Sequence, residues 1–181
     1  MKSMVSKVAA VLMLAATTGV GARAQFSTAC TDATLKGDYS VTISGQIFLP
    51  GGVVVQRLGI NITHFDGAGH LVQEDLVLSS PNAPAPPGVS PTNAAGLHID
   101  ETGTYAVNPD CTGALTINFP NLTTPGGGSV KGAVISAHFT ISDSGRAVHI
   151  LVTSLTPPGA PGPVPALISS EGRKIGPIEQ D

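Results

Sequence analysis

The chain has 181 residues, with 9 Lys and Arg against 12 Asp and Glu and a formal net charge of −3. The basic residues are scattered singly, so the sequence lacks the clustered positive charge that nucleic acid or an anionic membrane surface requires, and we expect no nucleic-acid partner. Glycine (22) and proline (15) are abundant, which favours short β-strands separated by turns over helices.

The first 24 residues have the pattern of a signal peptide. Lys2 and Lys7 form a basic start, residues 8–16 are an apolar run too short to span a bilayer, and Ala22-Arg23-Ala24 is a small-x-small cleavage pattern. Without Lys2, Lys7 and Arg23, the nine basic residues become six against twelve acidic ones, a net charge of −6 for residues 25–181. The sequence predicts a single secreted or periplasmic domain with no membrane span in the mature chain; an uncleaved anchor is the rival interpretation.

After the leader, runs rich in Val, Ile, Thr and Leu predict eight strands, at about 38–48, 53–64, 70–80, 97–107, 111–119, 130–142, 147–155 and 164–171. Most connections are short, so successive strands should pair antiparallel as a meander. The segments 66–69 and 143–146 are the clearest hairpin turns. Proline-rich segments at 81–96 and 156–165 should be loops, the first either a lid over one end or a surface insertion.

Alternation along each strand separates an apolar face from a polar one. Such apolar faces carry Tyr39, Val41, Ile43, Gly45 and Ile47; Leu115, Ile117 and Phe119; Ile135, Ala137, Phe139 and Ile141; and Val148, Ile150 and Val152. One apolar face per strand over eight meandering strands predicts an all-β fold, a closed up-and-down barrel. A two-sheet sandwich is the alternative.

Cys30 and Cys111 are the only two cysteines of the chain. In an exported protein we expect them to form a structural disulfide; a free cysteine or a bond between chains is the alternative. Asn61-Ile62-Thr63 and Asn121-Leu122-Thr123 match the glycosylation sequon, which matters only if the source organism attaches glycans.

Two pairs of adjacent carboxylates, Glu74 with Asp75 and Asp100 with Glu101, fall within predicted strands. Neighbouring strand residues point to opposite faces, so one of each pair should face inward unless a bulge intervenes. Their companions on each face decide which one: Glu74 alternates with Val72, Leu76 and Leu78, and Glu101 with Leu97, Ile99 and Tyr105. The pattern therefore predicts that Glu74 and Glu101 face the interior.

A carboxylate in an apolar interior keeps its proton to higher pH or recruits a polar partner, and Arg57 and Asn61 on the neighbouring strand could supply one. Either outcome would suit proton transfer, or the orientation of a polar ligand head. The alternative interpretation places Glu74 and Glu101 at strand ends, in water and without function.

The histidines are weaker candidates for a functional site than these carboxylates. His138 and His149 are predicted on outward faces, close together across the turn at Asp143, where a solvated surface is favoured over a weak metal site. His98 is predicted to alternate with Asp100 on an outward face. The sequence has no metal-ligand spacing and no nucleophile elbow, so it predicts no metal site and no cofactor.

Three motifs follow one another along the chain: Leu35-Lys36-Gly37-Asp38-Tyr39, Phe65-Asp66-Gly67-Ala68-Gly69, and Gly103-Thr104-Tyr105 through Asp110-Cys111-Thr112-Gly113. With these turns and strand starts, residues 30–170 resemble a group of small exported microbial proteins classed with the allene oxide cyclase barrel-like domain, among the calycin-type barrels. The resemblance implies an eight-stranded barrel whose lumen holds a small apolar molecule, in a superfamily that binds or cyclises such ligands without a cofactor. No catalytic residue of that family is carried over.

The leading hypothesis is a secreted barrel that binds a small hydrophobic or amphipathic molecule in its lumen. Its candidate ligand contacts are Arg57, Asn61, Glu74, Glu101 and Tyr105. One alternative is a cofactor-free cyclase or isomerase, with Glu74 or Glu101 moving a proton. The other is a packed structural or surface domain with no ligand.

Overall fold

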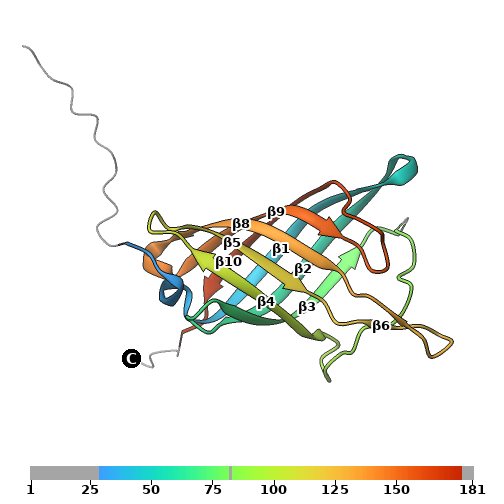
Figure 1. Cartoon of the computed structure of the whole chain (residues 1–181), viewed down its shortest axis with the longest axis horizontal. Helices are drawn as coiled ribbons and strands as arrows, with labels where there is room; N and C mark the ends of the chain where they lie inside the picture. Colours follow the sequence, from blue (N-terminus) through green and yellow to red (C-terminus); the bar gives the residue numbers. More distant parts are fainter. Residues whose placement is uncertain (1–28, 82, 177–181) are drawn as a thin grey trace, which may run out of the picture.

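The computed structural model describes residues 29–81 and 83–176; the predicted signal peptide lies outside these ranges. Eight antiparallel strands close into a barrel in the order β1-β10-β9-β8-β5-β4-β3-β2 (Figure 1). The strands are β1 (Gly37–Leu49), β2 (Val53–Phe65), β3 (His70–Ser79), β4 (His98–Val107), β5 (Thr112–Asn118), β8 (Val134–Ser142), β9 (Ala147–Thr156) and β10 (Ala166–Lys174). The predicted eight-stranded barrel is confirmed, and the sandwich alternative is wrong.

The first and last strands close the barrel. They pair from Tyr39 opposite Lys174 to Ile47 opposite Ala166, so neither β1 nor β10 is left with an unpaired edge. Two short strands, β6 (Leu122–Thr123) and β7 (Ser129–Val130), pair with each other outside the barrel. Within the described ranges, no helix has the length and apolar character needed to cross a membrane.

The chain segment before β1 closes one end of the barrel, called here the closed end (blue in Figure 1). It contains the short 3-10 helix η1 (Asp32–Leu35), whose Leu35 is fully buried. A Cys30–Cys111 disulfide ties this segment to the turn between β4 and β5, with the two Cα atoms 5.0 Å apart. The backbone carbonyl of Asp32 also accepts a hydrogen bond from the Tyr105 hydroxyl at 3.1 Å. The predicted disulfide is therefore confirmed, and it anchors the segment that closes this end of the barrel.

Two apolar clusters fill the barrel on either side of its middle. The cluster at the closed end contains Leu35, Tyr39, Val41, Phe65, Leu71, Tyr105, Leu115, Ala137, Phe139, Ile141 and Val148. The second cluster, Ile47, Val55, Val152, Leu155 and Ile168, lies toward the end that carries the β1–β2 hairpin and the two proline-rich loops, called here the loop end. Ala83 of the first proline-rich loop packs against this second cluster, and Val89 of the same loop pairs with Thr123. The first loop therefore contributes to the covering of the loop end.

The strands β2 and β3 carry apolar side chains on their outer faces as well as inside the barrel. Their outward positions hold Leu58, Ile60, Ile62, Val72, Leu76 and Leu78, each between 36% and 63% exposed. Leu58 pairs with Leu78 and Ile60 with Leu76, so these side chains form adjacent rows on the outer surface. The alternate positions point into the barrel, and in the middle of the two strands they carry the buried polar residues Asn61, Thr63, Gln73 and Asp75.

Candidate functional site

Polar side chains gather on one wall of the barrel interior, between the two apolar clusters. This polar wall consists of Arg57, Asn61 and Thr63 on β2, Gln73 and Asp75 on β3, and Glu101 on β4. All except the half-buried Arg57 are at most 7% exposed. The three strands opposite in the barrel order, β8, β9 and β10, present apolar residues to the interior, including Ala137, Val152 and Ile168. The interior is therefore polar on one side and apolar on the other.

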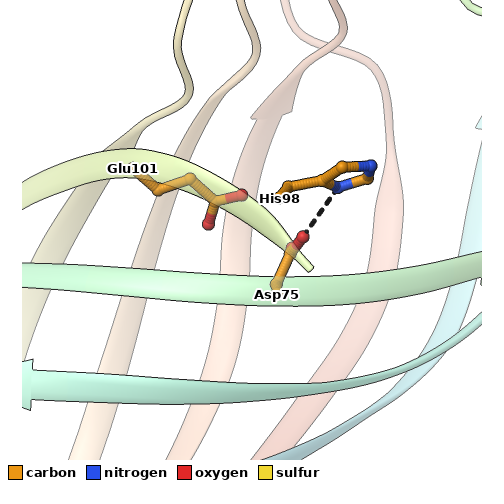
Figure 2. A group of neighbouring side chains, drawn as sticks. All are labelled: Asp75, His98 and Glu101. Carbon is orange, nitrogen blue, oxygen red and sulfur yellow. Dashed lines mark hydrogen bonds and ion pairs between the residues drawn. The ribbon is translucent and has the colours of Figure 1, made fainter. Parts of the chain in front are cut away.

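A bulge in β4 assembles the centre of the polar wall. Gln73 pairs with Glu101, and Asp75 pairs with His98, so one residue of β3 lies opposite two residues of β4. Asp100 has a positive φ of 65°, the left-handed conformation that occurs at many bulges. The extra residue brings His98 and Glu101, three positions apart, toward the same side of the strand. In Figure 2 both side chains point toward Asp75 on the neighbouring strand.

The three side chains make a compact group. The Nδ1 atom of His98 lies 2.9 Å from Oδ1 of Asp75, and a ligand atom from each of Asp75, His98 and Glu101 lies within 4.8 Å of the others. Glu101 is 0% exposed and Asp75 2%, whereas the His98 side chain is 36% exposed. The group is therefore buried on its carboxylate side and reaches solvent through the imidazole.

Among the described residues, one oxygen of Glu101 has a hydrogen-bond donor and the other has none. Gln73 Nε2 donates to Glu101 Oε2 at 2.6 Å, whereas Glu101 Oε1 finds no hydrogen-bond donor among the described residues. Burial, followed by repulsion from the Asp75 carboxylate, raises the pKa of Glu101 to about 9. Burial also raises the pKa of Asp75, opposed by its hydrogen bond to His98. Glu101 therefore keeps its proton at neutral pH when only protein groups surround it.

Arg57 provides a cationic group on the same wall. Its Nη1 donates to Ser79 Oγ at 2.6 Å, but its buried Nε has no acceptor in the part of the chain that the structure describes. Burial lowers the pKa of Arg57, and the nearby Asp75 carboxylate acts in the opposite direction. Because a guanidinium stays protonated in proteins, Arg57 presents a charged donor toward the interior.

The structure places the predicted site residues unevenly. Arg57, Asn61 and Glu101 all belong to the polar wall, and Asn61 Oδ1 accepts a hydrogen bond from the Thr63 hydroxyl at 3.0 Å. Asn61 is 7% exposed, so its sequon does not present an accessible amide on the folded barrel. Tyr105 also faces inward but lies in the apolar cluster at the closed end. Its hydroxyl accepts a hydrogen bond from the Gly67 N–H at 2.9 Å. Tyr105 is therefore part of the closed end and does not belong to the polar wall.

The prediction that Glu74 faces the interior is wrong. Glu74 is exposed on the outer surface, where its Oε2 accepts a hydrogen bond from Asn93 Nδ2 at 2.7 Å. The prediction that His98 faces outward with Asp100 is also wrong, because the bulge changes the alternation between them. The group Asp75, His98 and Glu101 was therefore not foreseen.

One sequence signal could have placed Asp75 inside. The four-residue turn 66–69 sets the register of β2 against β3, which pairs Asn61 with Asp75. Directly paired residues of neighbouring strands lie on the same face of a sheet. Because Asn61 was expected to face inward, its partner Asp75 had to face inward as well. Glu74, the neighbouring residue on the strand, then had to face outward.

The surface histidines lie where the sequence placed them. His138 and His149 are exposed on the outside of β8 and β9 and line an open groove with Glu171 and Ser169 of β10. His149 Nδ1 lies 3.8 Å from Glu171 Oε1. This groove is on the outer surface and is separate from the polar wall.

No family model matches the chain, and no curated protein or solved structure is significantly similar to it. The resemblance to allene oxide cyclase-like barrels therefore stays a prediction.

Proposed function

We propose that this barrel is an exported binding protein that holds a small amphipathic molecule between the polar wall and the apolar strands opposite it. Export is supported by the leader pattern of residues 1–24 and by the Cys30–Cys111 disulfide, because structural disulfides persist in oxidising compartments. Binding is supported by the division of the interior into a polar and an apolar side.

The observation that carries the proposal is the buried Nε of Arg57. Among the described residues it has no acceptor, and a buried charged donor without an acceptor costs free energy. An oxygen atom of a ligand head would satisfy it. Buried groups left unpaired by the protein are a common feature of sites that select ligands by hydrogen bonding.

The geometry also supports a particular chemistry for the proposed ligand. Its head should carry an acceptor oxygen, such as a carbonyl, hydroxyl or carboxylate, directed at Arg57. Its body should be apolar, because the facing strands contribute Val152 and Ile168. A linear or cyclic hydrocarbon body with one oxygenated end meets both conditions.

Entry should occur at the loop end, because η1 and the disulfide cover the closed end. Two open grooves lie on the outer surface, one lined by residues of β5 and β8–β10 and one by residues of β3, β4 and β5. We therefore expect a loop at the loop end to move when the ligand enters. The loop that contributes Ala83 to the second apolar cluster is the candidate.

Two measurements test the proposal. Protein purified from its own host is extracted with organic solvent, and co-purifying compounds are identified by mass spectrometry. The affinity for a dansyl-labelled fatty acid is then measured for the wild type, Arg57→Gln and the control Arg146→Gln, whose side chain is exposed. Because a hydrogen bond to a charged group is lost, Arg57→Gln should bind the probe about tenfold or more weakly than the wild type. Arg146→Gln should bind the probe as tightly as the wild type does.

The outcomes separate the three functional hypotheses. An amphipathic compound in the extract, together with the Arg57 effect, supports the proposal. No extracted compound and no uptake of the probe contradict it and favour the packed structural domain. Conversion of the recovered compound on incubation with fresh protein favours the cyclase or isomerase.

A further inference from the structure

We propose that Asp75, His98 and Glu101 form a binding site for a divalent first-row transition metal ion, with zinc as the expected occupant. The site goes beyond the binding function proposed above and does not depend on it. It joins two carboxylates and one imidazole that the bulge at Asp100 brings together (Figure 2).

The spacing of the ligand atoms fits a single ion. One atom from each of the three side chains lies within 4.8 Å of the other two. Carboxylate oxygens and imidazole nitrogens bind zinc at about 2.0 to 2.2 Å, so two ligands of one ion lie up to about 4 Å apart. Small rotations of the side chains would therefore close the group around an ion.

Glu101 brings a buried, unpaired oxygen to this group. Glu101 is 0% exposed, and its Oε1 lacks a hydrogen-bond donor within the described residues. The adjacent Asp75 carboxylate supplies only acceptors when it is ionised. Two buried carboxylates in this position need either a proton or a cation between them. A divalent cation would satisfy Glu101 Oε1 and reduce the repulsion from Asp75 at once.

The surrounding contacts prepare Glu101 as a ligand. Gln73 holds Oε2 through a 2.6 Å hydrogen bond and so leaves Oε1 for the ion. Metal-binding carboxylates are commonly oriented in this way by a second layer of hydrogen bonds. The bond from Thr63 Oγ1 to Gln73 Oε1, at 3.4 Å, continues the same chain of contacts into β2.

The ligand set also indicates the kind of metal. An imidazole nitrogen favours zinc and other first-row transition ions over Mg²⁺ and Ca²⁺, which prefer all-oxygen sites. Three protein ligands leave at least one coordination position for water or an added ligand. The His98 side chain is 36% exposed, which gives an ion a path into the site from solvent.

The test is a zinc titration of the disulfide-bonded protein after a chelator has removed any bound metal. Isothermal titration calorimetry measures the binding, and the melting temperature measures the effect on stability. We expect one zinc per chain and a higher melting temperature with zinc than with chelator. Glu101→Gln, Asp75→Asn and His98→Gln should each weaken zinc binding by about tenfold or more. The control Glu74→Gln removes an exposed carboxylate on the opposite face of β3 and should leave the affinity unchanged.

A second control addresses the outer surface, where His149 lies near Glu171. Zinc binding that is lost in His149→Gln but kept in Glu101→Gln would overturn the proposal in favour of a surface site. Absence of binding up to millimolar zinc, manganese and cobalt would overturn it in favour of a proton between the carboxylates. If Glu101→Gln does not fold, the partly exposed His98→Gln variant decides. Arg57→Gln should keep zinc binding, so failure of the ligand proposal is distinguishable from failure of this one.

Discussion

The closed end of the barrel and its polar wall are both buried, but they are built differently. At the closed end, aromatic rings pack edge-on, with Phe65 centred 5.4 Å from Tyr39 and 5.1 Å from Tyr105, and both tyrosine hydroxyls donate to backbone carbonyls. On the polar wall, Arg57 Nε and Glu101 Oε1 have no partner among the described residues. Among the described residues, the buried side-chain polar atoms of the closed end all have partners, whereas these two atoms of the polar wall do not. We therefore expect the stability of the fold and the proposed binding to depend on different parts of one interior.

The disulfide gives the largest test of this division. It closes a loop of 81 residues, which in the loop-entropy model stabilises the fold by about 4.5 kcal/mol. The double variant Cys30→Ala/Cys111→Ala should lose about that much free energy of unfolding, measured by urea denaturation. Probe and zinc affinities at the polar wall, measured where the variant is folded, should stay near those of the wild type. A large loss of affinity in the folded variant would show that the two regions are not separate.

Phe65→Ala tests the aromatic packing at the closed end. Phe65 is 1% exposed, and removal of a buried phenylalanine ring costs about 4 kcal/mol through lost contacts and a cavity. Leu58→Ala on the same strand is the matched control, because Leu58 is 63% exposed and surface changes usually stay within about 0.5 kcal/mol. Denaturation curves measure both. Equal losses would mean that the outer apolar row of β2 is buried in solution.

High pH should lower the free energy of unfolding through Tyr39 at the closed end. Burial, and secondarily Tyr105, raises the pKa of Tyr39 from 10.0 to about 12, and the hydroxyl donates to the Gly145 carbonyl. The unfolded chain loses this proton first, so the stabilisation is complete below pH 10 and is lost as the pH rises toward 12. We expect a loss of about 2 kcal/mol over that range.

The control for this pH dependence is Tyr39→Phe, which has no proton to lose. Its free energy of unfolding should fall less steeply between pH 10 and 12 than that of the wild type, although its value at neutral pH is lower because the hydrogen bond is missing. Parallel curves for the two proteins would refute the role assigned to Tyr39.

The contrast between the closed end and the polar wall also explains which parts of the structure could be predicted from the sequence. At the closed end, the inward apolar residues of β1, β5, β8 and β9 alternate with polar ones, so the barrel, its strands and the Cys30–Cys111 bond could all be read from residue patterns. In such strands the apolar face is the inner face, and alternation alone identifies it.

On β2 and β3 this rule fails, because both faces contain apolar residues. Val72, Leu76 and Leu78 make a regular apolar row, but the row faces outward. Alternation divides a strand into two faces and does not show which one is inside. The bulge at Asp100 adds a second difficulty, since a positive φ at an aspartate leaves no clear mark in the sequence. The polar wall was therefore only partly predicted, through Arg57, Asn61 and Glu101.

The smallest predicted effect concerns Gln73, which joins the residues of the polar wall. Its amide donates to Glu101 Oε2 at 2.6 Å, and it is 6% exposed. Gln73→Leu would leave both oxygens of Glu101 without a protein donor, at a cost of about 1.5 kcal/mol in the free energy of unfolding. Gln56→Leu, at an exposed position of β2, is the control and should change stability by less than about 0.5 kcal/mol.

The comparison of Gln73→Leu with Gln56→Leu becomes more informative when it is repeated with and without zinc. If an ion holds Glu101, the loss caused by Gln73→Leu should be smaller in saturating zinc than in chelator, because the metal then orients the carboxylate in place of the amide. If Gln73→Leu is as mild as Gln56→Leu in both conditions, the polar residues do not act as a connected network. The polar wall would then be a packed interior like the closed end, and its unpaired atoms would not support a binding function.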